Sequence, residues 1–129
     1  MAIDPRLAAR PGTGRRAEEL AVALLQGLGL QIVARNWRRP EGELDLVADD
    51  GGTCVFVEVR SRTGLNQGHP LESITARKRA QIIRAARLYL DGEPTRASAY
   101  RFDVVGVTFP EDGGDPVLLH IPNAFDLND

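Results

Sequence analysis

The chain has 129 residues, of which 43% are hydrophobic and 26% are charged, as in an ordinary globular domain. A chain of this length forms one domain with a core of its own. Its single cysteine, Cys54, excludes a disulfide scaffold and a cysteine-based zinc site. The sequence has no apolar run near the ~20 residues that span a bilayer and no apolar segment typical of a secretory signal. These features predict a reduced, cytoplasmic protein with no membrane partner.

The net charge of −2 conceals separate basic and acidic blocks. Residues 1–40 and 59–87 are strongly basic, whereas residues 41–58 and 111–129 carry acids and no lysine or arginine. Clustered basic residues make phosphate contacts. The pattern therefore fits a nucleic-acid partner, and it also fits a solvated charged surface.

The first half of the chain predicts a helix followed by three strands. Residues 1–12 are expected to form a flexible arm, because two prolines and a glycine interrupt them. A helix is predicted over residues 14–28, where apolar residues recur at helical spacing, with Thr13 as its N-cap. Short turns join the strands that follow and make neighbours antiparallel. The strands are expected over residues 30–37, 43–48 and 53–60.

The second half predicts one more helix and two more strands. After a polar loop over residues 63–70, a helix is predicted from its N-cap, Thr75, to Leu90. This helix is long enough to cross over to a parallel fourth strand. The last two strands are expected over residues 100–109 and 117–121. The order α-β-β-β-α-β-β predicts an α/β domain over residues 13–125, with a mixed sheet of about five strands flanked by helices, and a tail over residues 126–129.

Two adjacent strands carry acids where an α/β sheet is usually apolar. Glu43 and Asp45 lie on the second strand, and Glu58 lies on the third, two residues before Arg60. If Asp45 and Glu58 converge, each raises the pKa of the other unless a cation lies between them. A hard divalent ion such as Mg²⁺ suits these oxygen ligands and activates water for attack on a phosphodiester. Glu18, on the margin of the first helix's apolar face, is placed to approach the same point.

The same acids also fit a structure without a metal. Glu43 then pairs with an arginine, and Asp45 faces solvent on an edge strand. Glu58 and Arg60 then form a surface ion pair. Spacing alone does not decide between the two interpretations, because patterns of two carboxylates are common.

Seven short segments add a stronger signal, because they occur together in one order and spacing. They are GRRAEELA at 14–21, RNWR at 35–38, GELDLV at 42–47, VFVEVRSR at 55–62, KR at 78–79, RFDVV at 101–105 and NAF at 123–125. Over residues 12–125 the chain resembles the YraN family, an uncharacterised group of small bacterial proteins. That family is similar to archaeal Holliday-junction resolvases and to PD-(D/E)xK nucleases of the restriction-endonuclease-like fold.

The resemblance implies a metal-dependent endonuclease acting on DNA, including branched DNA, with Mg²⁺ or Mn²⁺ as cofactor. It implies that Asp45 and Glu58 are catalytic metal ligands and that Glu18 completes the metal site. Glu43 matches a Gly-Glu-x-Asp element, either behind the ligands or as the partner of an arginine. Because resolvases act as symmetric dimers, a homodimer is expected by analogy.

Arg60 stands where the pattern has a lysine, and this departure leaves the activity open. Arginine keeps the positive charge that stabilises a phosphate, so Arg60 remains a catalytic candidate. An arginine does not act as a base, because its guanidinium stays protonated in proteins, and its bulk can displace the nucleophile. One alternative is a non-catalytic nucleic-acid-binding or scaffold module that keeps the fold. Another is a structural protein without a nucleic-acid partner.

Other residues have simpler expectations. His69 and His120 are expected to have no special role, and Cys54 is expected to be a small buried hydrophobic residue. Asp103 is expected to buttress Arg101 or an arginine of the site. The residues expected to contact DNA phosphates are Arg15, Arg16, Arg38, Arg39, Arg62, Arg77, Lys78 and Arg79.

Overall fold

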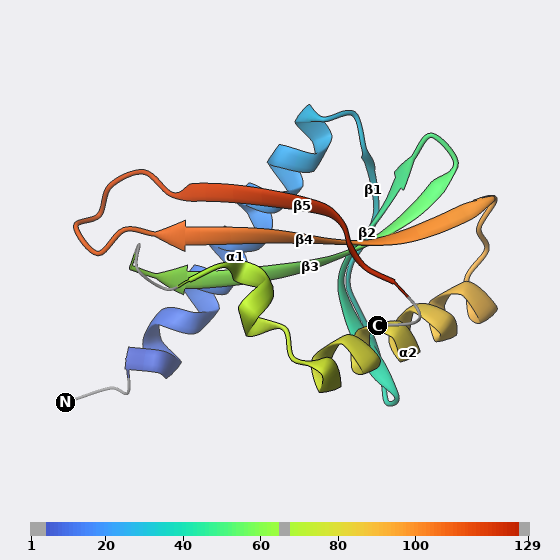
Figure 1. Ribbon diagram of the computed structural model, residues 1–129, viewed down its shortest axis with the longest axis horizontal. Coiled ribbons are helices and arrows are strands. Elements are labelled where there is room, and N and C mark those ends of the chain that lie inside the picture. Colours follow the sequence, from blue (N-terminus) through green and yellow to red (C-terminus); the bar gives the residue numbers. More distant parts are fainter. Residues whose placement is uncertain (1–4, 65–67, 127–129) are drawn as a thin grey trace.

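The computed structural model describes residues 5–64 and 68–126, with side chains described from Gly14 onward. A five-stranded sheet carries a long helix on each face (Figure 1). The elements follow the order α-β-β-β-α-β-β that the sequence predicts. The helices are α1 (Pro5–Gly27), the short 3-10 helix η1 (Pro70–Ser73) and α2 (Ala76–Gly92). The strands are β1 (Gln31–Arg39), β2 (Gly42–Asp50), β3 (Thr53–Thr63), β4 (Ala99–Phe109) and β5 (Val117–Phe125).

The strands lie side by side in the order β1-β2-β3-β4-β5. β1, β2 and β3 form an antiparallel meander, β4 is parallel to β3, and β5 returns antiparallel to β4. The predicted pairing is confirmed, since short turns join the first three strands and α2 forms the crossover to the fourth. Neither long helix in the described part of the chain combines the length and apolar character that crossing a bilayer requires.

Side chains of the sheet alternate between two cores, one under each long helix. Val55 and Val57 face α1 and pack in one cluster with Leu25. Phe56, between them in sequence, faces α2 and packs in the other cluster with Ile82. The central strand β3 is therefore apolar on both faces, as expected of a strand with helices on both sides.

Cys54 lies in the core on the α2 side and is 5% exposed. Burial, followed by the charge of Asp49, raises the pKa of its thiol to about 11. The thiol is therefore protonated at neutral pH and a poor nucleophile. The expectation of a small buried hydrophobic residue is confirmed.

α1 begins at Pro5, so it is longer than the helix predicted over residues 14–28. The predicted N-cap at Thr13 is wrong, because the helix continues through it, and residues 5–12, expected as an arm, are helical. Proline is tolerated at the first helical position, where no N–H is needed, and the leucine, alanines and arginines that follow favour a helix. Residues 1–4 of the expected arm and 127–129 of the expected tail lie outside the described residues.

β2 pairs with β3 only over its second half, from Leu46 opposite Val57 to the turn after Asp50. Its first half remains paired with β1, and the two strands bend together toward α2 (Figure 1). The turn between them lies against α2, since a Cβ added at Gly42 would be 3.0 Å from Cβ of Ala85. Beyond Val57, β3 is therefore paired with β4 along one edge, and its other edge is no longer paired with β2.

A glycine on β4 allows η1 to pack closely on the sheet. A Cβ added at Gly106 would collide with Cγ of Pro70 in η1, so η1 would have to shift. Gly106→Ala is therefore expected to lower the free energy of unfolding by about 1–3 kcal/mol, as overpacking of a core does. Chemical denaturation measures this change.

The matched control is Gly27→Ala at the end of α1, where an added Cβ meets nothing within 4 Å. This variant is expected to be neutral or slightly stabilising, because alanine favours a helix more than glycine does. Equal unfolding midpoints for the two variants would contradict the close packing of η1 on β4.

Candidate functional site

A side chain of β2 bonds to β3 at the point where the two strands part. The backbone N–H of Val59 donates to Oδ2 of Asp45, with 2.8 Å between nitrogen and oxygen. Asp45 thereby takes the place of a backbone carbonyl. On β1, opposite this point, Asn36 has a left-handed φ of 49°, a conformation that asparagine tolerates better than most residues. The carboxylate of Asp45 thus lies at the gap between β2 and β3.

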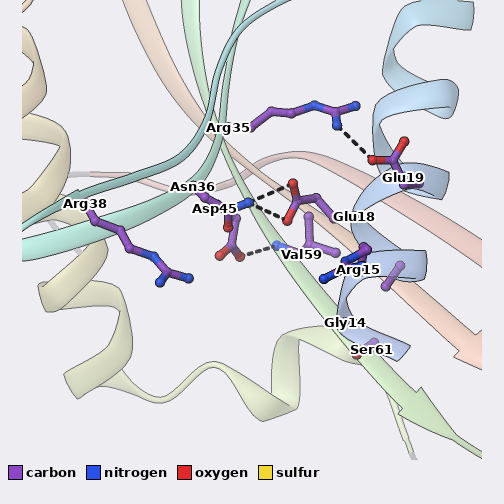
Figure 2. Close-up of a pocket in the computed structure, with 11 residues that line it drawn as sticks. Gly14, Arg15, Glu18, Glu19, Arg35, Asn36, Arg38, Asp45, Val59 and Ser61 are labelled. Atoms are coloured by element: carbon purple, nitrogen blue, oxygen red, sulfur yellow. Dashed lines mark hydrogen bonds and ion pairs between the residues drawn. The ribbon is translucent and has the colours of Figure 1, made fainter. Parts of the chain in front are cut away.

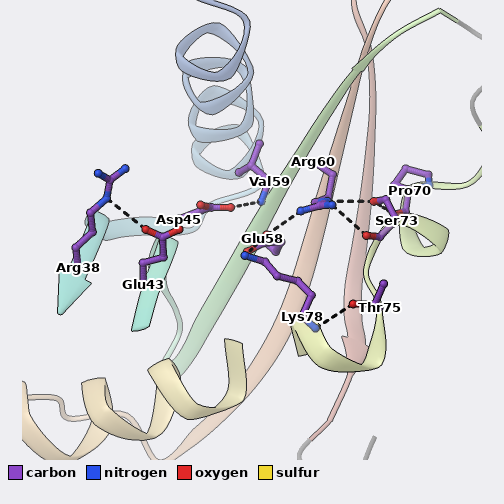
Figure 3. Close-up of polar contacts among 10 residues, drawn as sticks. All are labelled: Arg38, Glu43, Asp45, Glu58, Val59, Arg60, Pro70, Ser73, Thr75 and Lys78. Carbon is purple, nitrogen blue, oxygen red and sulfur yellow. Dashed lines mark hydrogen bonds and ion pairs between the residues drawn. The ribbon is translucent and has the colours of Figure 1, made fainter. Parts of the chain in front are cut away.

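Glu58 lies beside this gap, with only 7% of its side chain exposed. Its Oε1 is 3.4 Å from Nη1 of Arg60 and 3.6 Å from Nζ of Lys78, which reaches across from α2 (Figure 3). Burial has the largest effect on the pKa of Glu58 and raises it, and the charge of Asp45 raises it further. The charge of Lys78 lowers this pKa, a hydrogen bond with Asp45 raises it, and Arg60 lowers it. The net result is a pKa of about 8 for Glu58.

Arg60 is bound mainly to η1. Its Nε donates to Oγ of Ser73 and its Nη2 donates to the carbonyl oxygen of Ser73, both at 3.0 Å. Oγ of Ser73 in turn donates to the carbonyl oxygen of Pro70 at 2.7 Å. The guanidinium therefore joins β3 to η1 while one of its nitrogens contacts Glu58 (Figure 3).

A pocket of about 570 Å³ lies between α1, β1 and the free edge of β3. Asp45 and Glu18 both line it, together with the exposed Arg15 and Arg38 (Figure 2). Both carboxylate oxygens of Glu18 accept from Nδ2 of Asn36 at 2.9 Å. α1 thus places Glu18 over the same pocket as Asp45, and β1 holds it there.

The structure relates the three predicted ligands in pairs. Asp45 and Glu18 line the same pocket, whose lining does not include Glu58, and Asp45 lies near enough to Glu58 to raise its pKa. Within residues 5–64 and 68–126, no three His, Cys, Asp or Glu side chains are grouped as a metal ion requires. By their chemistry, the carboxyl groups of Asp45 and Glu58 are oxygen donors of the kind that a hard divalent cation takes.

The basic residues predicted to contact DNA occupy different environments. Arg15, Arg16, Arg38, Arg39 and Arg77 are exposed, whereas Arg62, Lys78 and Arg79 are partly buried. Several also have partners within the protein: Arg16 with the ring of Phe109, Arg38 with Glu43 at 3.6 Å, Arg39 with Glu93 at 2.9 Å, and Arg62 with Thr108 at 3.1 Å. Exposed ion pairs of this kind contribute little to stability, so such arginines can exchange their partner for a phosphate.

Asp103 and the two histidines do not line the pocket that contains Asp45 and Glu18. Fully buried, Asp103 accepts hydrogen bonds from Nε of Arg101 at 3.0 Å and from the backbone N–H of Asn123 at 2.9 Å. It therefore buttresses Arg101, and it also contacts Nε2 of His120 on β5 at 2.8 Å. His69 accepts a backbone hydrogen bond at the start of η1. Both histidines thus have structural partners.

Two residues that shape the site are absent from the sequence-based prediction. Asn36 holds Glu18, and its one sequence signal is its residue type, since asparagine within a strand can mark a left-handed turn of the backbone. Ser73 holds Arg60, and no local pattern marks it, because the contact joins residues from different elements.

The raised pKa of Glu58 predicts a pH-dependent stability. Folding favours the protonated carboxyl, so the stabilisation from this group is complete below pH ~4.5 and is lost as the pH rises through about 8. Glu58→Gln mimics the protonated form and is expected to raise the free energy of unfolding by a few kcal/mol at pH 8.5. Near pH 4 it is expected to have little effect. Denaturation at both pH values measures the difference.

Glu41→Gln, in the exposed turn between β1 and β2, is the matched control, with the same chemical change outside the core. Its effect on stability is expected to stay within about 0.5 kcal/mol at both pH values. A Glu58→Gln variant no more stable than the wild type at pH 8.5 would show that Glu58 is not held protonated.

Comparison with known protein families and with similar proteins shows to which family the chain belongs. The family model described as "Uncharacterised protein family UPF0102" matches residues 17–107. A UPF0102 protein of Pseudomonas aeruginosa is 51% identical over 114 residues, which cover 88% of this chain and 91% of that protein. One from Clavibacter michiganensis is 48% identical over 111 residues, covering 86% and 93%. One from Acidothermus cellulolyticus is 43% identical over 127 residues, covering 91% and 96%. The chain belongs to the UPF0102 family.

Proposed function

We propose that this protein is a divalent-metal-dependent endonuclease that hydrolyses DNA phosphodiesters, with branched DNA among its substrates. The observation that carries the proposal is that Asp45 lines an arginine-lined pocket at the gap between β2 and β3 and raises the pKa of the buried Glu58 on the neighbouring strand. Arg60 and Lys78 offset the charge of the buried Glu58 only in part, since its pKa remains raised, and a divalent cation would offset the charges of both acids. A carboxyl group with a strongly raised pKa beside a pocket, as Glu58 has, is typical of functional sites. The resemblance of the chain to PD-(D/E)xK nucleases supports the same interpretation.

The residues of the site divide the work. Asp45 and Glu58 would hold the cation, and Glu18, lining the same pocket, is the third candidate ligand. Mg²⁺ or Mn²⁺ bound there would supply an activated water and neutralise charge on the phosphate. Val59 fixes the carboxylate of Asp45 through its backbone N–H. Arg15, at the pocket, would orient the DNA backbone through charge-assisted hydrogen bonds.

A non-catalytic nucleic-acid-binding module is the second candidate function. Two contacts favour it, because they occupy groups that a nuclease would use. Glu18 is bonded through both oxygens to Asn36, and Arg60 is bonded to Ser73. In such a module the pocket would bind phosphates without cleaving them.

Cleavage assays separate the two functions. The wild type is expected to cut at least one of linear duplex, flap and four-way-junction DNA with Mg²⁺ or Mn²⁺. Asp45→Asn is expected to lower the single-turnover rate by ~100-fold or more, because it removes a ligand charge with little change of shape. Asp49→Asn, on the same strand, is the control, because its Oδ1 accepts a hydrogen bond within the β2–β3 turn and an amide oxygen does the same.

Arg60→Lys adds a second comparison. It is expected to preserve or raise the rate, and Asp45→Asn is expected to abolish cleavage in that background as well. A wild type and an Arg60→Lys variant that bind DNA but are silent on every form tested would reject the nuclease and favour the binding module.

Arginines at the pocket are expected to contact DNA phosphates. The double variant Arg15→Gln/Arg38→Gln should weaken DNA binding. It should also reduce the slope of log affinity against log salt by up to ~2, because fewer counterions leave the DNA on binding when two phosphate contacts are lost. Arg96→Gln, at an exposed arginine between α2 and β4, is the control for loss of one positive charge outside the pocket and is expected to change the slope by less than either substitution at the pocket. Fluorescence anisotropy with labelled DNA measures both slopes. A slope equal to that of the wild type would place the DNA on another surface.

A further inference from the structure

We infer that Lys78, and not Arg60, supplies the cationic group that contacts the scissile phosphate and the attacking water beside Glu58. The inference rests on the proposed nuclease function and names a further catalytic residue for it. Nζ of Lys78 and Nη1 of Arg60 approach the same oxygen, Oε1 of Glu58, at 3.6 and 3.4 Å. The two cations therefore flank the acid, and the question is which one can serve a substrate.

Arg60 is committed to the fold. Its Nε and Nη2 both donate to Ser73, and Nη1 contacts Glu58. Reorienting this guanidinium toward a phosphate would break the contact between β3 and η1. Its planar fork therefore serves as a bridge within the protein, a geometry for which arginine is well suited.

Lys78 has a fixed backbone and a less committed ammonium. Oγ1 of Thr75 accepts from the backbone N–H of Lys78 at 3.1 Å, so the N-cap of α2 anchors this residue. An ammonium has three N–H donors, and Glu58 is the acceptor that the described residues provide within ion-pair distance. The side chain is 31% exposed and lines a second pocket of about 570 Å³ between the β1–β2 turn and α2. Donors therefore remain for a phosphate oxygen or a water.

The amino-acid composition points to the same residue. Lys78 is the single lysine of the chain, against fifteen arginines. Arginine provides the positive charge elsewhere, so composition bias alone does not account for a lysine here. A compact ammonium has three donors on a flexible stem and can contact a buried acid and a water together, whereas the donors of a guanidinium have fixed directions. The one lysine of the chain thus lies next to Glu58.

Lys78→Met and Arg60→Met form a matched pair, since each removes one of the two cations at Oε1 of Glu58. Single-turnover cleavage is measured with Mn²⁺ on the DNA form that the wild type cuts fastest. Lys78→Met is expected to lower the rate by ~100-fold or more, as loss of a transition-state donor does, while retaining the melting temperature. Arg60→Met is expected to lower the melting temperature, because two hydrogen bonds between β3 and η1 are lost, with less than a ~10-fold loss of rate.

Calorimetric titration with Mn²⁺ gives a readout that does not depend on turnover. Lys78→Met is expected to bind Mn²⁺ at least as tightly as the wild type, because a cation that repels the metal is removed. A greatly weakened Mn²⁺ affinity would mean that Lys78 only maintains the geometry of the ligands, which would overturn the inference.

Chemical restoration of the ammonium tests the role of its charge. Lys78→Cys treated with 2-bromoethylamine regains a primary amine of nearly the same length, and Cys54 is protected by its burial and raised pKa. Treated Lys78→Cys is expected to cleave DNA at least ~10-fold faster than the untreated variant. Mass spectrometry checks that one thiol is alkylated. Alkylation without recovery would overturn the inference.

The outcomes distinguish this inference from the function on which it rests. A wild type silent on every DNA overturns the proposed function, and the role of Lys78 with it. A wild type that cleaves, with Lys78→Met within threefold of its rate, overturns the inference alone. If Lys78→Met is unfolded at the assay temperature, Lys78→Arg replaces it and is expected to lose at least ~10-fold. Retention of the full rate by a folded Lys78→Arg variant would also overturn the inference.

Discussion

The hydrogen bond from the backbone N–H of Val59 to the carboxylate of Asp45 fixes where the sheet ceases to be continuous. A buried N–H left without an acceptor costs about 1–3 kcal/mol, so the departure of β2 from β3 requires a substitute for the missing carbonyl. Asp45 is that substitute. The same carboxylate lines the pocket and raises the pKa of Glu58. The side chain of Asp45 thus lies where the pairing of β2 and β3 ends and also forms part of the site. Because it satisfies the N–H of Val59, the gap between the two strands is compatible with a stable fold.

The environment of Glu58 shows which electrostatic effect prevails in this site. Two cations lie within 4 Å of its carboxyl group, and yet its pKa is raised. The side chains of Arg60 and Lys78 are 32% and 31% exposed, so water screens their charges, whereas that of Glu58 is 7% exposed. Desolvation of the buried acid therefore exceeds the attraction of its partly solvated partners. The site holds an unfavourable arrangement of charge that the surrounding packing maintains.

Most of the fold could be predicted from the sequence, because its elements are encoded by local signals. Helical periodicity predicts α2, alternation predicts β2, and the short turns predict the antiparallel meander. The unexpected features arise from contacts between distant segments. Asn36 adopts a left-handed φ within a strand and binds Glu18 of another element. The bridge from Arg60 to Ser73 forms only when η1 packs on the sheet. Local patterns in the sequence identify the candidate ligands. Tertiary packing decides which of their carboxylate oxygens already accept hydrogen bonds within the protein.

The parallel pairing of β3 with β4 has a consequence for how the protein folds. Every other pair of neighbouring strands is joined by a short connection, but Thr53 pairs with Ala99 and Thr63 with Phe109, across η1 and α2. Bringing such distant segments together incurs a large loss of chain entropy before their contacts form. The β1–β2–β3 meander and the β4–β5 hairpin are therefore expected to form early, with closure of the crossover as the slow step. Until that step is complete, the central strand of the native sheet has an unpaired edge.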